Sequence, residues 1–196
     1  MRSHLIVETN VLISGLSNVK APLNGIWGSE DIFAQPNMDK IEALLVSYDS
    51  GAQFEIIDTN GQNYKANAGI KIFGGWSRGN AQKSFSLFAR KKYGDSKFDY
   101  QIFPESDVVD YESFILRNSG NDWEQTMLRD GYINSLIRFT GVDYQQYRPA
   151  IGFINGEYWG IYNMREKISE HFISSHHDVP TDNISLLAYN GGFEDN

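Results

Sequence analysis

Residues 149–168, PAIGFINGEYWGIYNMREKI, contain the pattern that decides the fold. The short apolar run at 150–154 predicts a strand, and residues 157–162 predict a second strand whose side chains alternate between two faces. Asn155-Gly156 lies between them and is a strong hairpin signal, because both central residues of a type I′ turn need positive φ. The stretch therefore predicts an antiparallel hairpin.

The residues that follow the hairpin predict a helix. Asn163 can cap its N-terminus, and Met164, Ile168 and Phe172 recur every four residues, as on the apolar face of a helix. A hairpin that leads directly into an amphipathic helix needs a larger sheet beside it and a core to pack against.

Length and composition allow one domain of generous size or two small ones. The chain has 196 residues, of which 41% are hydrophobic and 14% aromatic, so it can bury a sizeable core. It has no cysteine, which excludes disulfides, a thiolate nucleophile and Cys-ligated zinc. No apolar run is long enough for a membrane span, and the first residues are too polar for a signal peptide.

The net charge of −8 argues against a general nucleic-acid-binding protein. The charge is unevenly distributed, since residues 70–97 carry a net +6, which leaves −14 for the remainder. The acid in this segment is Asp95, and its basic residues are Lys71, Arg78, Lys83, Arg90, Lys91, Lys92 and Lys97. Such a strip predicts a confined anion site, and a pair of strands with solvated basic residues explains it equally well.

The first half of the chain predicts an antiparallel meander, because turn residues separate short runs that favour strands. The predicted strands are 5–13, 41–48, 53–58, 69–73 and 82–90, with turns at Ser50-Gly51 and Asn60-Gly61. Residues 112–118 predict one more strand. The meander and its two helices predict an α+β fold, with an antiparallel β-sheet meander and two packed helices.

The first of these helices is predicted within residues 121–139. Asn121 or Asp122 can cap its start, and Gly141 can end it. Its apolar residues recur at helical spacing, so we expect them to pack on the sheet; they are Leu128, Tyr132, Leu136 and Phe139.

A loop at residues 74–80, GGWSRGN, joins two of the predicted strands and is rich in small residues. It can present backbone N–H groups to a phosphate, with Arg78 beside them and Lys83 on the following strand. This arrangement resembles a kinase phosphate loop followed by a strand lysine, although the spacing G-G-x-x-x-G departs from the usual G-x-G-x-x-G. An ordinary wide hairpin loop is the alternative.

A strand lysine of this kind needs a carboxylate on a helix. Glu166 is the first candidate and Glu170, four residues later, is the second. At about 100° per residue, Glu166 lies almost opposite the apolar stripe of its predicted helix. A glutamate that faces water is therefore the alternative interpretation.

A dense polar group surrounds the start of the first predicted helix, and its members are Arg117, Asn121, Asp122, Arg129 and Asp130. It can be a metal or phosphate site, or, more ordinarily, a capped helix with one or two buried ion pairs. The four histidines lack zinc spacing, and no Ser-His-Asp arrangement occurs. The sequence therefore predicts no metal ligand and no catalytic residue.

Three segments together resemble the CotH family, the spore-coat protein H-like atypical kinases found in secreted or surface-associated form in many bacteria. They are AGIKIFGGWSRGNAQKSFSLFARKKYGDSKFDYQIFP (68–104), FILRNSGNDWEQTMLRD (114–130) and RPAIGFINGEYWGIYNMREKISEHF (148–172). The resemblance covers roughly residues 41–187, and the first and third segments are specific.

The resemblance implies a kinase-like fold that binds ATP with Mg²⁺ or Mn²⁺ and phosphorylates protein Ser/Thr at the bacterial surface. This part of the chain is then the nucleotide-side, N-terminal lobe. Lys83 is implied to contact the nucleotide, Arg78 to assist with phosphate, and Glu166 to form an ion pair with Lys83. The glycines implied to lie at the phosphates are Gly74, Gly75 and Gly79.

One departure limits what the resemblance implies. The metal-binding and catalytic aspartates of the family lie in an N-T-D-W-x-x-N-N-like run and a later Y-D-x-D-like run, and neither occurs in this sequence. We therefore expect an inactive portion of a kinase, with an irregular extension at 1–40, the kinase-like lobe at 41–187 and a truncated tail at 188–196. The alternative is a non-catalytic surface or scaffold module whose exposed aromatic residues bind a partner; the candidates are Trp27, Trp76, Trp123 and Trp159.

Overall fold

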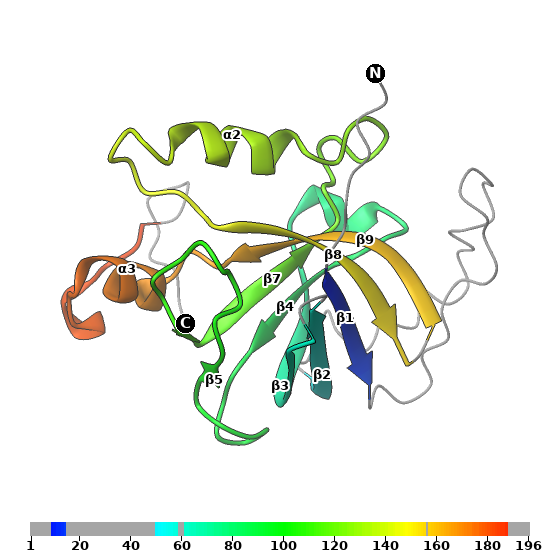
Figure 1. The fold of residues 1–196 in the computed structure, drawn as a ribbon, viewed down its shortest axis with the longest axis horizontal. Coiled ribbons are helices and arrows are strands. Elements are labelled where there is room, and N and C mark those ends of the chain that lie inside the picture. Colours follow the sequence, from blue (N-terminus) through cyan, green and yellow to red (C-terminus); the bar gives the residue numbers. More distant parts are fainter. Residues whose placement is uncertain (1–8, 15–49, 59–60, 156, 188–196) are drawn as a thin grey trace.

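The structure is a computed structural model that describes residues 9–14, 50–58, 61–155 and 157–187. In this part of the chain, seven strands form a closed barrel in the order β1-β2-β3-β4-β7-β9-β8 (Figure 1). These strands are β1 (Thr9–Ser14), β2 (Ser50–Asp58), β3 (Asn63–Phe73), β4 (Ser84–Phe88), β7 (Ser113–Arg117), β8 (Tyr147–Ile154) and β9 (Glu157–Glu166). The predicted α+β class is confirmed, but the meander is not an open sheet.

The barrel closes because β1 pairs with β8 in parallel, while all its other neighbouring strands are antiparallel. The remaining elements lie outside it. They are the two-stranded sheet β5 (Phe98–Asp99) and β6 (Asp110–Tyr111), the helices α2 (Arg129–Ile137) and α3 (Glu170–His177), and the 3₁₀ turns η3 (Trp76–Gly79) and η4 (Thr181–Asn183).

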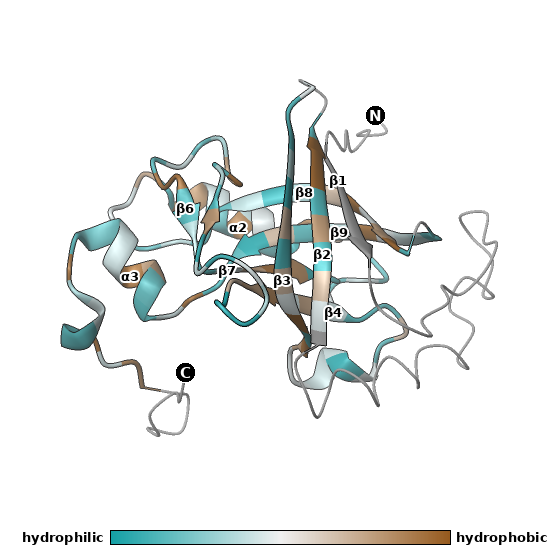
Figure 2. Cartoon of the chain, turned by 90° about the horizontal axis from the view of Figure 1, so that it is seen from below, coloured by the Kyte–Doolittle hydropathy of each residue, from teal (hydrophilic) through white to brown (hydrophobic). Residues whose placement is uncertain are grey.

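Alternate strand residues point into the barrel and form its core, and apolar and polar positions alternate along β2 (Figure 2). Phe54 at the centre makes edge-to-face contacts with Phe98 at 4.9 Å and Phe114 at 5.4 Å between ring centroids. Aromatic pairs of this geometry are worth about 0.5–1.5 kcal/mol beyond the area that they bury. Aromatic residues are therefore prominent in this core.

The predicted hairpin at 149–168 is confirmed as β8 and β9, which pair from Tyr147 and Arg165 to Ile154 and Glu157. Asn155 has φ +52°, as the turn requires; its partner Gly156 lies outside the described residues. The prediction of a helix that starts at Asn163 is wrong, because β9 continues to Glu166.

The second helix, α3, starts later than predicted. Ser169 is its N-cap, and the Ser169 hydroxyl accepts a hydrogen bond from the Phe172 N–H at 3.4 Å. Met164 points into the barrel core, Phe172 is buried under α3, and Ile168 between the two elements is exposed. The spacing of four from Met164 to Phe172 therefore runs across two elements, β9 and α3, and does not mark one face of a single helix.

Helix α2 lies over the outside of β8 and β9 (Figure 1). It is shorter than predicted, and the prediction that its apolar stripe packs on the sheet is wrong, because Tyr132, Leu136 and Phe139 are exposed. The contact is made on another side of the helix, where Gly131 is buried against the Tyr147 ring. The predicted cap is wrong, because the N-cap residue is Leu128 and makes no side-chain cap hydrogen bond; the Asp122 carboxylate still accepts a hydrogen bond from the Arg129 N–H at 3.0 Å.

The remaining sequence predictions concern the Ser50-Gly51 turn, four strands and a membrane span. Ser50 and Gly51 do not form a turn but belong to β2, where they pair with Ile70 and Gly69. The predicted strand at 41–48 lies outside the described residues. Strands near 5–13, 82–90 and 112–118 are confirmed with shifted ends as β1, β4 and β7. Within the described residues, none of the helices is long and apolar enough to cross a membrane.

Candidate functional site

A cavity of about 410 Å³ lies between the loop at 74–80 and the outer face of the sheet, and we call it the loop cavity. Loop residues 73–77 form one wall, and Asn121 and Gln145 lie at its edges. Its floor contains two cations from neighbouring strands, Arg117 on β7 and Arg165 on β9, beside Ser84 and Ile115. The sequence-predicted loop therefore faces a basic floor.

The loop wall is a tight turn. Gly74 has φ +105°, which favours glycine, and a Cβ at this position would lie 2.4 Å from the Ser77 Oγ. The Arg78 N–H donates to the Gly75 carbonyl at 3.1 Å, and Trp76 at the tip is fully exposed. The tip therefore projects beside the cavity.

Lys83 supports the backbone of this loop. Its side chain is buried, its Nζ donates to the Arg78 carbonyl at 2.6 Å, and it does not line the loop cavity. The Arg78 side chain is exposed. Of the three glycines singled out in the sequence, Gly74 and Gly75 line the cavity and Gly79 does not.

The structure does not bring Lys83 and Glu166 together. Glu166 is opposite Phe114, and Phe114 is opposite Leu87 on β4, four residues beyond Lys83. That offset is about 14 Å along the strands, in addition to two strand spacings of about 5 Å each. The Glu166 carboxylate instead accepts a hydrogen bond from the Gln146 N–H at 2.9 Å and lies 3.4 Å from the His176 Nε2.

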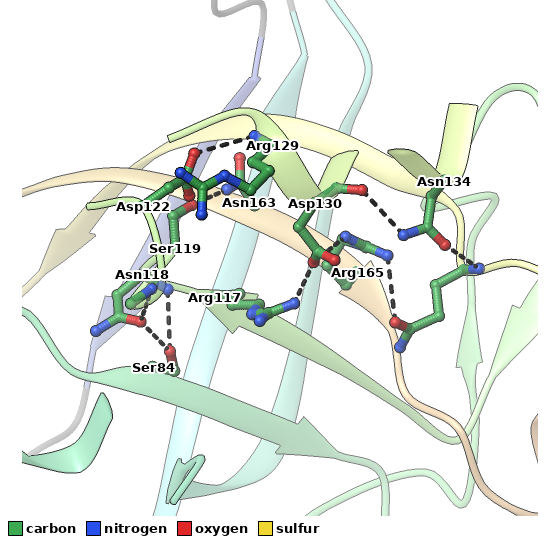
Figure 3. Close-up of polar contacts among 12 residues, drawn as sticks. Ser84, Arg117, Asn118, Ser119, Asp122, Arg129, Asp130, Asn134, Asn163 and Arg165 are labelled. Atoms are coloured by element: carbon green, nitrogen blue, oxygen red, sulfur yellow. Dashed lines mark hydrogen bonds and ion pairs between the residues drawn. The ribbon is translucent and has the colours of Figure 1, made fainter. Parts of the chain in front are cut away.

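The strand–helix ion pair of the site is formed by other residues. Asp130 on α2 accepts hydrogen bonds through one oxygen, Oδ2, from Arg117 Nη1 and from Arg165 Nη1, the latter at 2.5 Å (Figure 3). The Asp130 backbone carbonyl also accepts from the Asn134 side-chain amide at 2.9 Å. A single carboxylate therefore serves two guanidinium groups, which leaves local positive charge at the cavity floor.

Arg165 is almost fully buried, with a side-chain exposure of 1%. Burial lowers the pKa of Arg165, whereas the charge of Asp130 acts in the opposite direction. Its Nη2 donates to the Gln145 Oε1 at 3.2 Å, but its Nε has no hydrogen-bond partner. A buried donor without a partner is uncommon and is typical of a position that a ligand or water completes.

Arg165 belongs to a row of residues that crosses the outer face of four strands. Ser86, Ile115, Arg165 and Tyr147 are opposite one another on β4, β7, β9 and β8. The Ser86 Oγ and the Tyr147 hydroxyl are also buried without a partner, and burial raises the pKa of Tyr147 to about 12. Three polar atoms of this row thus have unused hydrogen-bonding capacity, and of the three residues only Arg165 lines the loop cavity.

A buried network fixes the segment between β7 and α2. The Ser84 hydroxyl donates to the Asn118 Oδ1 at 2.8 Å, and that oxygen also accepts from the Gly120 N–H at 3.1 Å. Gly120 is close to the loop, since a Cβ there would lie 2.6 Å from the Ser77 Cβ. The segment and the loop wall therefore hold each other in place.

The sequence singled out Arg117 and Asp130 within a polar group and left an ion-pair role open; the structure places Arg117 in the cavity lining and pairs Asp130 with it. It did not single out Arg165. The available signal was strand alternation continuing past Tyr162, which puts Arg165 on the same face as Asn163. The predicted helix obscured this signal.

The tryptophans differ in their surroundings. Trp159 is buried and packs on Phe85 at 6.3 Å between ring centroids, so it is a core residue. Trp123 is half-buried and donates to the Gln82 Oε1 at 3.0 Å. Trp76 is exposed, and Trp27 lies outside the described residues. Trp159 is therefore no candidate for an aromatic binding surface.

No metal ligands can be assigned in the described part of the chain. Among those residues, no three His, Asp or Glu side chains are grouped so that they could hold a metal ion. The loop cavity instead places two arginines beside a glycine-containing loop, and this arrangement is suited to a multiply charged anion.

The family model for CotH kinase protein matches residues 70–196, a span that contains the loop, Arg117, Asp130 and Arg165. The search among curated proteins finds no match.

Proposed function

Since the chain belongs to the CotH kinase family, we propose that it binds the phosphates of ATP in the loop cavity. The observation that carries the proposal is the pair of arginines on the cavity floor, which share the carboxylate of Asp130 and include an unpartnered buried Nε. Arginine recognises phosphate oxygens through paired N–H donors, so the floor offers a chemically matched surface.

The arrangement also parallels the phosphate site of protein kinases. There a glycine-rich loop covers the phosphates, and a strand cation paired with a helix carboxylate contacts them. In this chain Arg117 on β7 takes the part of the strand cation, and Asp130 on α2 takes the part of the helix carboxylate. The loop at 74–80 takes the part of the cover. Lys83 and Glu166, which the resemblance implied for these roles, have other partners.

Bound ATP supplies a transferable phosphoryl group. Arg117 and Arg165 hold the phosphate oxygens, Asp130 orients both guanidinium groups, and Lys83 keeps the loop wall in position through the Arg78 carbonyl. We propose protein Ser/Thr as the acceptor, and Mg²⁺ or Mn²⁺ as the metal, on the strength of the family alone. The described residues provide no ligand set for this metal.

Replacement of Arg117 tests the site. We expect the wild-type chain to bind ATP with a Kd near the millimolar range, which corresponds to a binding free energy of about −4 kcal/mol. Arg117→Met is expected to weaken binding at least about tenfold, because it removes phosphate donors and lets Asp130 neutralise Arg165 completely. Isothermal titration at low ionic strength measures the effect.

Arg138→Met is the matched control, since Arg138 lies just beyond α2 and forms an exposed ion pair with Glu105 away from the cavity. It should bind ATP like the wild type. Equal affinity of the wild type and Arg117→Met would refute the phosphate site.

A second expectation concerns turnover. We expect these 196 residues to bind ATP without transferring its phosphoryl group, because they lack the aspartate-containing runs that the family resemblance requires for the metal and the acceptor hydroxyl. Incubation with labelled ATP, Mg²⁺ or Mn²⁺ and a Ser-rich protein checks this. Incorporation that persists in purified wild type and disappears in Arg117→Met would contradict it.

A further inference from the structure

The three histidines that the structure describes all lie on α3, and each contacts a carboxylate from a different segment. His171 Nε2 lies 2.6 Å from Glu112 between β6 and β7, and His177 Nε2 lies 2.8 Å from Asp143 after α2. His176 Nε2 lies 3.4 Å from Glu166 at the end of β9. One helix of eight residues is therefore attached at three separate points.

His176 has oxygen acceptors at both ring nitrogens. Its Nδ1 lies 2.8 Å from the Phe172 carbonyl, and its Nε2 faces the Glu166 carboxylate. Neutral imidazole has only one N–H, so only the imidazolium form donates to both oxygens. Because Glu166 is only 3% exposed, its charge also depends on a nearby cation for compensation.

We propose that α3 is a pH-sensitive clamp, which docks on the end of the barrel while its histidines are protonated and loosens when they lose their protons. The buried residues of α3 are Glu170 and Phe172, and the Phe172 ring lies 4.3 Å from the His176 ring between centroids. A cavity of about 350 Å³ separates α3 from the barrel end, so apolar packing here is incomplete.

Other charged and titratable groups lie around α3. They are Lys97, Asp107, Asp110 and Tyr111 on the β5–β6 side, Lys167 after β9, Glu170 and Asp178 at the ends of α3, and Asp182 in η4. Lys97 forms an ion pair with Asp110 at 2.8 Å, which raises the pKa of Lys97, and burial raises the pKa of Tyr111 to about 12. Both therefore keep one charge state near neutral pH.

The carboxylates act in the same direction as the histidines. Burial raises the pKa of Glu166 and of Glu112, so the charged form of each is costly in the docked state, and the His176 and His171 cations offset that cost only while they are protonated. The histidine ion pairs require the imidazolium form and are lost when the rings give up their protons. Both contributions weaken docking with increasing pH.

Two spin labels test the clamp, and the cysteine-free sequence makes their placement simple. Ser175→Cys puts one label on an exposed position of α3, and Lys65→Cys puts the other on an exposed position of β3. Distances are measured at about pH 5.5 and about pH 8.5, on either side of the ordinary histidine pKa. We expect one narrow distance at the lower pH and a clearly broader, longer distribution at the higher pH.

Matched variants separate the clamp from general effects of pH. Replacement of His171, His176 and His177 by Gln should remove the pH response, and His176→Gln alone should reduce it, which covers the case in which the triple variant fails to fold. A label pair at Lys65 and Arg90 should not respond. An unchanged wild-type distribution, an equal response in the triple variant, or a response of the Lys65–Arg90 pair would each overturn the proposal.

Discussion

Asp130→Asn is expected to lower the free energy of unfolding by about 3 kcal/mol, because it leaves the buried Arg165 without its ion-pair partner. Breaking a buried pair from one side costs about 3–5 kcal/mol, and we take the lower end because the Asp130 side chain is 36% exposed. For a chain of this size, the loss lowers the Tm by about 6–12 °C. Thermal unfolding followed by circular dichroism measures it.

The same variant links stability to anion binding. Asp130 orients both guanidinium groups, so without its carboxylate charge Arg117 and Arg165 are no longer held in place at the floor, and tripolyphosphate should raise the Tm of Asp130→Asn less than that of the wild type. Glu105→Gln, which breaks the exposed pair with Arg138, is the control and should change stability by at most about 1 kcal/mol. Wild-type stability of Asp130→Asn would show that the two arginines do not depend on Asp130.

The fold could be predicted in part, because some local patterns had one physical solution. Asn155-Gly156 between two alternating runs specified the β8–β9 hairpin, and alternation near residues 82–90 specified β4. Closure of the barrel could not be predicted from these patterns, since it depends on the parallel pairing of β1 with β8, two segments far apart in the sequence.

The wrong helix after Tyr162 has a specific cause. Strand alternation continues through Arg165 and Glu166, but both side chains are buried, Arg165 under α2 and Glu166 at the barrel end beside α3. Charged residues normally indicate an exposed face, so two adjacent buried ones conceal the period of two. Tertiary packing, absent from local sequence, decides their burial.

The candidate site, too, could be predicted only in part. The loop at 74–80 and the polar residues Arg117 and Asp130 were visible as local features. Their combination into one site was not, because it requires β4, β7 and β9 to be neighbours and α2 to lie above them. Lys83 was chosen for its position after the loop, yet its side chain supports the loop backbone.

Gly131→Val is expected to weaken ATP binding at least about tenfold by displacing α2 from the sheet. A Cβ at Gly131 would lie 2.7 Å from the Tyr147 ring, so the larger side chain forces the helix and Asp130 away from Arg117 and Arg165. Overpacking of this kind costs about 1–3 kcal/mol, whereas the low helix propensity of glycine, about 1 kcal/mol below alanine, acts in the opposite direction. The overlap dominates, because the Tyr147 ring lies directly below the helix.

Titration with ATP and circular dichroism together measure this effect, since the barrel should remain folded while affinity falls. Ser135→Val adds the same side chain at an exposed position of α2 and should leave affinity unchanged. Adding Tyr147→Ala to Gly131→Val removes the ring that the new side chain strikes, and we expect it to restore part of the affinity. Full ATP binding by Gly131→Val would show that the close approach of α2 to β8 is not what positions Asp130 over the two arginines.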